Sequence, residues 1–209
     1  LLVIFGNDVI IFSVKYSDFN RSIDTKVAWG RWFKKAIIGS VRQINGAEQW
    51  LRRFPDGIYL DKNCQHKLPI SIPAQSEIRV HRVAVALGVY EGCKEFFGGQ
   101  SLGSLIIHSG LKDGAHFQNP FNVGHVDSQK GFVHFFEDFT LNAVLRELDT
   151  ITDFVAYLSK KEEFLSRVKP VIVATGEEQI LSIYLTHLNS EGEHDFALPG
   201  GDKNEVDYI

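Results

Sequence analysis

The first fifteen residues, Leu1-Leu-Val-Ile-Phe-Gly-Asn-Asp-Val-Ile-Ile-Phe-Ser-Val-Lys15, decide the fold. β-Branched and aromatic residues predominate in 1–5 and 9–15, as is typical of β-strands. Gly6, Asn7 and Asp8 separate the two runs, and Gly and Asn tolerate the positive φ angles of a tight turn. The stretch therefore predicts a β-hairpin.

A long helix is expected after the hairpin, because apolar residues recur at helical spacing from 22 to 53. Asp24 is a plausible N-cap, and Pro55-Asp56-Gly57 ends the pattern. If glycine breaks the helix, the segment divides into two helices at Gly39 or Gly46.

The rest of the chain alternates between strand and helix patterns. The clearest strand is 78–90, whose nearly continuous apolar run is typical of a strand covered on both faces. Further strands are expected at 58–60, 67–72, 104–108, 131–137 and 171–174. Further helices are expected from Asp138 or Thr140 to 148, from Thr152 or Asp153 to 166, and over 177–188. This alternation predicts an α/β or α+β fold.

The composition is that of an ordinary globular chain, with 44% apolar and 23% charged residues. No apolar run approaches the roughly eighteen residues that a membrane span needs, so no membrane partner is expected. The two cysteines, Cys64 and Cys93, give no disulfide framework, which favours a reducing compartment and a cytoplasmic location. The chain begins at Leu1 and contains no Met, so we expect residues upstream of Leu1 in the whole protein.

Charge is distributed unevenly along the chain. Residues 1–70 hold 11 Lys and Arg against 6 Asp and Glu, whereas residues 71–209 hold 11 against 20. A basic N-terminal part favours a local surface that binds a polyanion. The alternative is chance variation between the two parts.

The hairpin resembles the core of restriction-endonuclease-like, or PD-(D/E)xK, nucleases. These proteins carry an Asp on one strand and a Glu/Asp-x-Lys on its hairpin partner. Ser13-Val14-Lys15 occupies the second position, so Lys15 matches the pattern and Ser13 does not. The resemblance places the family's Asp immediately before Leu1. Asp8 lies in the turn, about 20 Å from Lys15 along the strand, and does not replace it.

The resemblance implies a metal-dependent phosphodiesterase chemistry. Paired carboxylates would hold Mg²⁺ against the scissile phosphate. Lys15 lies on the same strand face as position 13 and would orient the attacking water. Ser13 can reach a metal only through water and supplies no charge.

Helix residues extend the resemblance. Several branches of the superfamily place a Gln on the helix after the motif strand, and Gln43 matches that position. Glu48 is the alternative, because some relatives carry an active-site acid on this helix. Gln43 shares a face with Ser40 and Ala47, whereas Glu48 points away from it. Gln43 is therefore preferred.

The helical segment is also the most basic part of the chain. Residues 24–53 hold seven Lys and Arg against Asp24 and Glu48. Basic residues interleaved with tryptophans are typical of contacts with a nucleic-acid backbone. The predicted DNA-binding residues are Arg31, Lys34, Lys35 and Arg42. The alternative is a solvated amphipathic helix whose tryptophans Trp29, Trp32 and Trp50 pack into the core.

Other patterns carry less chemistry. His108, His116, His125 and His134 do not have the spacing of a zinc site. The Gly-rich stretch 98–104 lacks the Gly-Lys-Ser/Thr ending of a phosphate loop. The histidines are interpreted as scattered surface or strand residues, and the Gly-rich stretch as a flexible loop.

The expected organisation is a restriction-endonuclease-like core over 1–90, a mixed sheet flanked by helices. An appended α+β region over 91–188 and an acidic, mobile tail over 189–209 follow it. The leading function is metal-dependent cleavage of DNA, as in proteins of phage defence or mobile elements. The alternative is a non-catalytic module, derived from the nuclease fold, that binds nucleic acid or protein.

Overall fold

The computed structural model describes residues 1–99, 101–167, 171–196 and 207–208. The predicted hairpin is present: β1 (Leu2–Phe5) pairs antiparallel with β2 (Asp8–Tyr16), and Gly6 takes a φ of 56° in the turn. β2 then pairs in parallel with β3 (Arg79–Leu87), which pairs in parallel with β6 (Val133–Phe136). The resulting first sheet has the order β1-β2-β3-β6.

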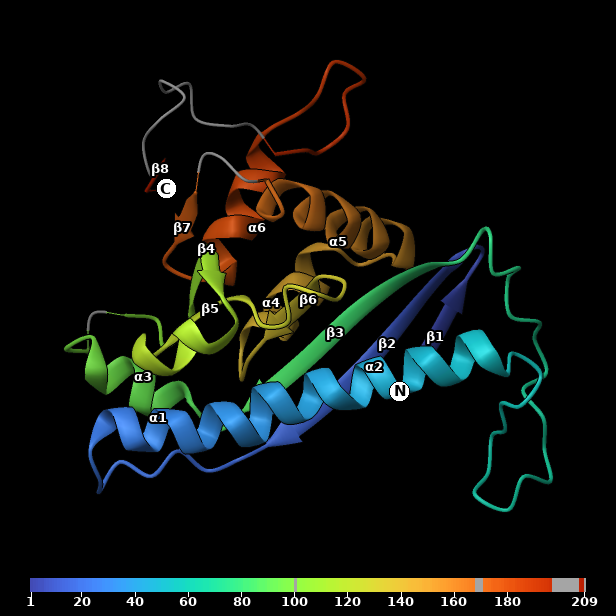
Figure 1. The fold of residues 1–209 in the computed structure, drawn as a ribbon. Coiled ribbons are helices and arrows are strands. Elements are labelled where there is room, and N and C mark those ends of the chain that lie inside the picture. Colours follow the sequence, from blue (N-terminus) through green and yellow to red (C-terminus); the bar gives the residue numbers. More distant parts are fainter. Residues whose placement is uncertain (100, 168–170, 197–206, 209) are drawn as a thin grey trace.

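One continuous helical rod connects β2 to β3 and lies along the hairpin strands (Figure 1). It consists of α1 (Thr25–Phe33), the π-helical segment η1 (Lys34–Ile38) and α2 (Gly39–Arg53). Asp24 caps it as expected, accepting a hydrogen bond from the Val27 amide at 3.1 Å. Neither Gly39 nor Gly46 breaks the rod. The irregularity is the π turn instead, which widens the helix just before α2.

Helix α5 (Ile151–Leu165) covers the opposite face of the first sheet. Phe154 stacks on Phe12 of β2 with ring centroids 6.4 Å apart, and also meets Phe136 of β6 at 6.5 Å. Thr150, rather than Thr152 or Asp153, caps this helix by accepting from the Asp153 amide. Strand β6 lies beyond residue 90, so the segment expected to be appended supplies one strand of the first sheet.

A second sheet has the order β5-β4-β7-β8. Its strands are β4 (Ile106–Lys112), β5 (Asn122–His125), β7 (Ile172–Ala174) and β8 (Asp207–Tyr208). The remaining helices are α3 (Tyr90–Phe96), the 3₁₀ helix η2 (Asp113–Gln118), α4 (Thr140–Glu147) and α6 (Glu177–Thr186). The α/β class predicted from the sequence is confirmed: both sheets are mixed and helices flank the first.

The strands expected at 58–60 and 67–72 are wrong. Only one isolated antiparallel bridge, between Tyr59 and Lys67, forms there. Pro69 and Pro73 supply no amide hydrogen to a ladder, and the segment 54–78 runs outside the sheets (Figure 1). None of the helices in the described ranges combines the length and the apolar character needed to cross a membrane.

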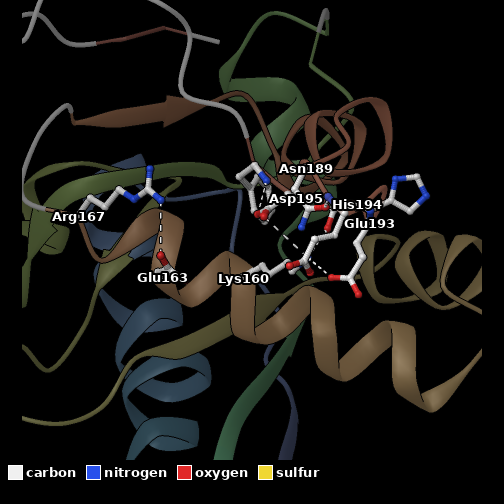
Figure 2. A network of polar contacts seen from close by, with 9 residues as sticks. Lys160, Glu163, Arg167, Asn189, Glu193, His194 and Asp195 are labelled. Carbon is white, nitrogen blue, oxygen red and sulfur yellow. Dashed lines mark hydrogen bonds and ion pairs between the residues drawn. The ribbon is translucent and has the colours of Figure 1, made fainter.

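The start of the segment expected to be a mobile tail packs against α5 (Figure 2). Lys160 donates to the His194 carbonyl oxygen at 2.6 Å and lies 3.4 Å from a Glu193 carboxylate oxygen. Phe196 is buried and stacks on Phe164 with ring centroids 4.6 Å apart. The rest of the expected tail, 197–206 and 209, lies outside the described residues.

Candidate functional site

Strand β2 directs Ser13 and Lys15 to the face of the first sheet that the α1–α2 rod covers. Successive side chains alternate between the faces of a strand, so residues 13 and 15 share one face. Ser13 is only 2% exposed, and Lys15 is half-buried. Their neighbours in β3 are the small residues Ala84 and Ala86, which leave room above the sheet.

Gln43 of α2 meets Ser13 directly. The Ser13 hydroxyl donates to Gln43 Oε1 at 3.0 Å, joining two elements that are thirty residues apart in sequence. Ser40, one helical turn earlier, is fully buried, and its hydroxyl has no hydrogen-bond partner among the described residues. The hydrogen bond to Ser13 occupies the Gln43 carbonyl oxygen and leaves its amide N–H groups as donors.

Lys15 crosses the same space one turn earlier along α2. A Cβ added at Gly39 would lie 3.4 Å from Lys15 Cε and 3.6 Å from Nζ, so the lysine side chain passes within van der Waals distance of this position. Within the described residues, no carboxylate forms an ion pair with the Lys15 ammonium group. Ser13, Lys15 and Gln43 thus come together, with one uncompensated positive charge.

A pocket of about 290 Å³ opens beside this group, between the hairpin and α2. Gln43 supplies its polar lining together with the backbone. The other lining residues are apolar: Leu1, Leu2, Ile11, Phe12, Ile44, Ala47, Trp50, Leu51 and Ile58. A mostly apolar cleft with a few converging polar groups is the usual form of a ligand site.

The four predicted DNA-binding residues, Arg31, Lys34, Lys35 and Arg42, are all exposed on the outer side of the rod. In the described ranges none of them forms an ion pair with a carboxylate. Their charges are therefore available to a polyanion. Trp29 and Trp32 are buried and belong to the core, as the alternative interpretation expected, whereas Trp50 is exposed.

The two acids weighed as alternatives from the sequence, Asp8 and Glu48, have structural partners. Glu48 is 8% exposed and binds the Arg82 guanidinium through two hydrogen bonds of 2.6 and 2.7 Å, and Arg52 at 2.9 Å. Asp8 accepts from Arg79 at 2.7 Å and contacts His81 Nε2 at 2.8 Å. Both carboxylates are paired with arginine, and neither forms a hydrogen bond or an ion pair with Ser13 or Lys15.

The side chains at the site do not fit a divalent cation. Ser13 and Gln43 offer a hydroxyl and an amide oxygen, and the adjacent ammonium repels a cation, whereas Mg²⁺ is usually bound through one or two carboxylates. Among the described residues, no cluster of three His, Cys, Asp or Glu can hold a metal ion. The hairpin register pairs Leu2 with Ile11, and Leu1 exchanges backbone hydrogen bonds with Phe12. A residue preceding Leu1 would stand opposite Ser13.

Sequence reasoning missed a buried charged cluster on the α5 side. Lys161 pairs with Glu177 at the start of α6, and the Tyr157 hydroxyl donates to the same carboxylate at 2.6 Å. Burial raises the pKa of Glu137, at the end of β6, to about 8, although the Leu105 amide donates to it. No spacing rule links these positions, so the sequence carried no signal for them.

The chain was compared with protein-family models, with curated proteins and with solved structures, and none of them matches it.

Proposed function

We propose that the cleft between the β1–β2 hairpin and α2 binds the phosphodiester backbone of DNA, in a module that resembles the nuclease fold. The observation that carries the proposal is the meeting of Ser13 with Gln43 at 3.0 Å, beside the unpaired Lys15. The Lys15 ammonium and the Gln43 amide are donors, and phosphate oxygens are acceptors. No carboxylate of the described residues pairs with Lys15, so its charge is available to an approaching anion.

The outer surface of the rod extends the binding site. Arg31, Lys34, Lys35 and Arg42 are exposed cations on the elements that carry Gln43. Contacts with several phosphates release counterions, so affinity falls as salt concentration rises. The arrangement supports binding that depends on the backbone and not on the base sequence.

The test is fluorescence anisotropy of a labelled DNA duplex with the full-length protein over a series of salt concentrations. Lys15→Met is expected to weaken binding by about tenfold, which is about 1.4 kcal/mol, and to lower the salt slope by about one. Lys112→Met is the matched control, because Lys112 is an exposed lysine of the second sheet. Binding that does not respond to salt, or equal losses in both variants, would contradict the proposal.

A second candidate function is metal-dependent cleavage of DNA, the activity that the resemblance implies. The hairpin register favours it, because a residue preceding Leu1 would face Ser13. Incubating plasmid DNA with full-length protein and Mg²⁺ or Mn²⁺ separates the two functions. Metal-dependent nicking that Lys15→Met abolishes would replace a purely binding role with catalysis.

A cytoplasmic location is part of the same proposal. Both cysteines are free, Cys64 on the surface and Cys93 in the core. Burial raises the pKa of the Cys93 thiol to about 12, so it is an unreactive core residue.

A further inference from the structure

The exposed tryptophan of the chain lies beside the candidate site. Trp50 is 55% exposed, whereas Trp29 and Trp32 are almost completely buried. The neighbouring Phe54 is 45% exposed, and its ring centroid lies 4.7 Å from that of Trp50. Exposing two adjacent aromatic rings costs the protein hydrophobic stabilisation, so a ligand that covers them gains it.

The tryptophan ring is held in place before any ligand arrives. Its indole N–H donates to the Gly57 carbonyl oxygen at 3.3 Å, and Phe54 packs against it. A ring that is already oriented loses little conformational freedom on binding. The pair therefore forms a ready aromatic platform at the C-terminal end of α2.

Trp50 of the platform and Gln43, which is proposed to bind phosphate, lie on one face of α2. Gln43, Ala47 and Trp50 follow the i, i+4, i+7 spacing and all line the pocket of about 290 Å³. Seven residues of α-helix separate Gln43 from Trp50 by about 10 Å along the axis. The pocket has room for about ten waters, which an inserted planar group would displace.

We infer that Trp50 stacks on an unpaired base of single-stranded DNA whose backbone is held at Lys15 and Gln43. This inference rests on the proposed function and specifies its substrate class. An unpaired base offers a free π-face, whereas the bases of a duplex are stacked on one another. Charge supports this occupant, because Arg42 and Arg53 are exposed on the same helix. An apolar peptide would gain nothing from these cations.

The test compares single-stranded with duplex DNA, using full-length protein and labelled oligonucleotides of mixed sequence. Trp50→Leu keeps an apolar side chain but removes the π-system. It is expected to weaken single-strand binding by about tenfold and to change duplex binding by less than about twofold. Trp50→Phe is expected to recover most of the single-strand affinity.

Phe139→Leu is the matched control, because Phe139 is 55% exposed beside α4, away from the pocket. Titration with unlabelled single strands should also quench tryptophan fluorescence, and Trp50→Phe should remove that response. Thermal unfolding of each variant verifies the fold.

The outcomes separate the two proposals. If Trp50→Leu loses single-strand affinity and the control Phe139→Leu does not, the stacking role is supported. Equal affinities of wild type and Trp50→Leu, with the Lys15→Met defect intact, overturn the stacking role and leave the phosphate site standing. Failure of the protein to bind either form of DNA overturns both. If tryptophan fluorescence is quenched as protein concentration rises in the absence of DNA, the platform takes part in self-association. That result would also overturn the inference.

Discussion

A lysine lies on each face of the first sheet, and the two lysines have opposite surroundings. On the α2 face, Lys15 is half-buried and has no carboxylate partner among the described residues. On the α5 face, Lys161 is 2% exposed, pairs with Glu177, and lies over the Phe136 ring at 4.9 Å. Glu177 is itself 1% exposed and also accepts from Tyr157.

The difference identifies which lysine has a structural role and which is available for binding. A buried charge is tolerated only with a well-placed partner, because desolvation of an isolated ion costs several kcal/mol. Lys161 meets that condition inside the protein. Lys15 keeps contact with solvent, so its charge is available to a partner from outside. Variants of both regions measure this contrast.

The largest expected effect is that of Lys161→Met, which leaves the Glu177 carboxylate buried without its counter-ion. We expect the free energy of unfolding to fall by about 3–5 kcal/mol, measured by urea denaturation at pH 7. The double variant Lys161→Met/Glu177→Gln removes both charges and should recover most of that loss. A single variant as stable as wild type would remove the contrast between the faces.

Glu137 gives the next largest effect, and it depends on pH. Its pKa is raised from 4.5 to about 8, chiefly by burial. Between these values the unfolded chain loses its proton while the folded protein keeps it, so stability falls as pH rises from about 4.5 to 8. Glu137→Gln should increase the free energy of unfolding at pH 8 by on the order of 1–4 kcal/mol.

The same variant should have little effect at pH 4, where the carboxyl group is protonated in both states. Its amide oxygen can still accept from the Leu105 amide, as Glu137 does at 3.0 Å. Urea denaturation at the two pH values tests this. A gain that is equal at pH 4 and pH 8 would show that proton linkage is not its cause.

Gly39→Ala tests the passage of Lys15 along α2. Replacing glycine inside a helix should stabilise the protein by about 0.5–1 kcal/mol. The new methyl group would meet Lys15 Cε at 3.4 Å, an ordinary van der Waals contact, and would restrict the conformations open to the lysine side chain. DNA affinity, measured by anisotropy, should fall about two- to threefold.

Gly46→Ala is the control for that change, because nothing lies within 4 Å of a Cβ at Gly46. It should give the same gain in stability and leave DNA affinity unchanged. If both variants weaken binding equally, Gly39 has no special relation to Lys15.

The smallest expected effect is that of Lys15→Met on stability. A half-buried lysine without a partner contributes little to folding, so the free energy of unfolding should change by no more than about 0.5 kcal/mol. Urea denaturation of Lys15→Met and Lys161→Met compares the effect of the same substitution on the free energy of unfolding in two surroundings. A loss of several kcal/mol would mean that Lys15 is part of the core.

Local patterns predicted the hairpin, the helical rod, its cap at Asp24 and strand β3, because each depends on neighbouring residues. The alternation along β2 also predicted that Ser13 and Lys15 share one face. Helical spacing predicted that Gln43 and Glu48 point in different directions. The ion pairs Glu48–Arg82 and Lys161–Glu177 join residues 34 and 16 positions apart. They depend on how whole elements pack, which no local spacing encodes. The exposure of Trp50 beside buried Trp29 has the same origin.

The π turn at Lys34–Ile38 sets the phase between the two halves of the rod. It acts as a one-residue insertion that lets Trp29 and Trp32 face the core while Gln43 still faces Ser13. Winding the same residues as regular α-helix would rotate α2 by about 100° relative to α1. Trp29 and Trp32 could then no longer pack into the core while Gln43 faces Ser13. The wide turn at this short segment is therefore needed to hold both faces of the rod in place.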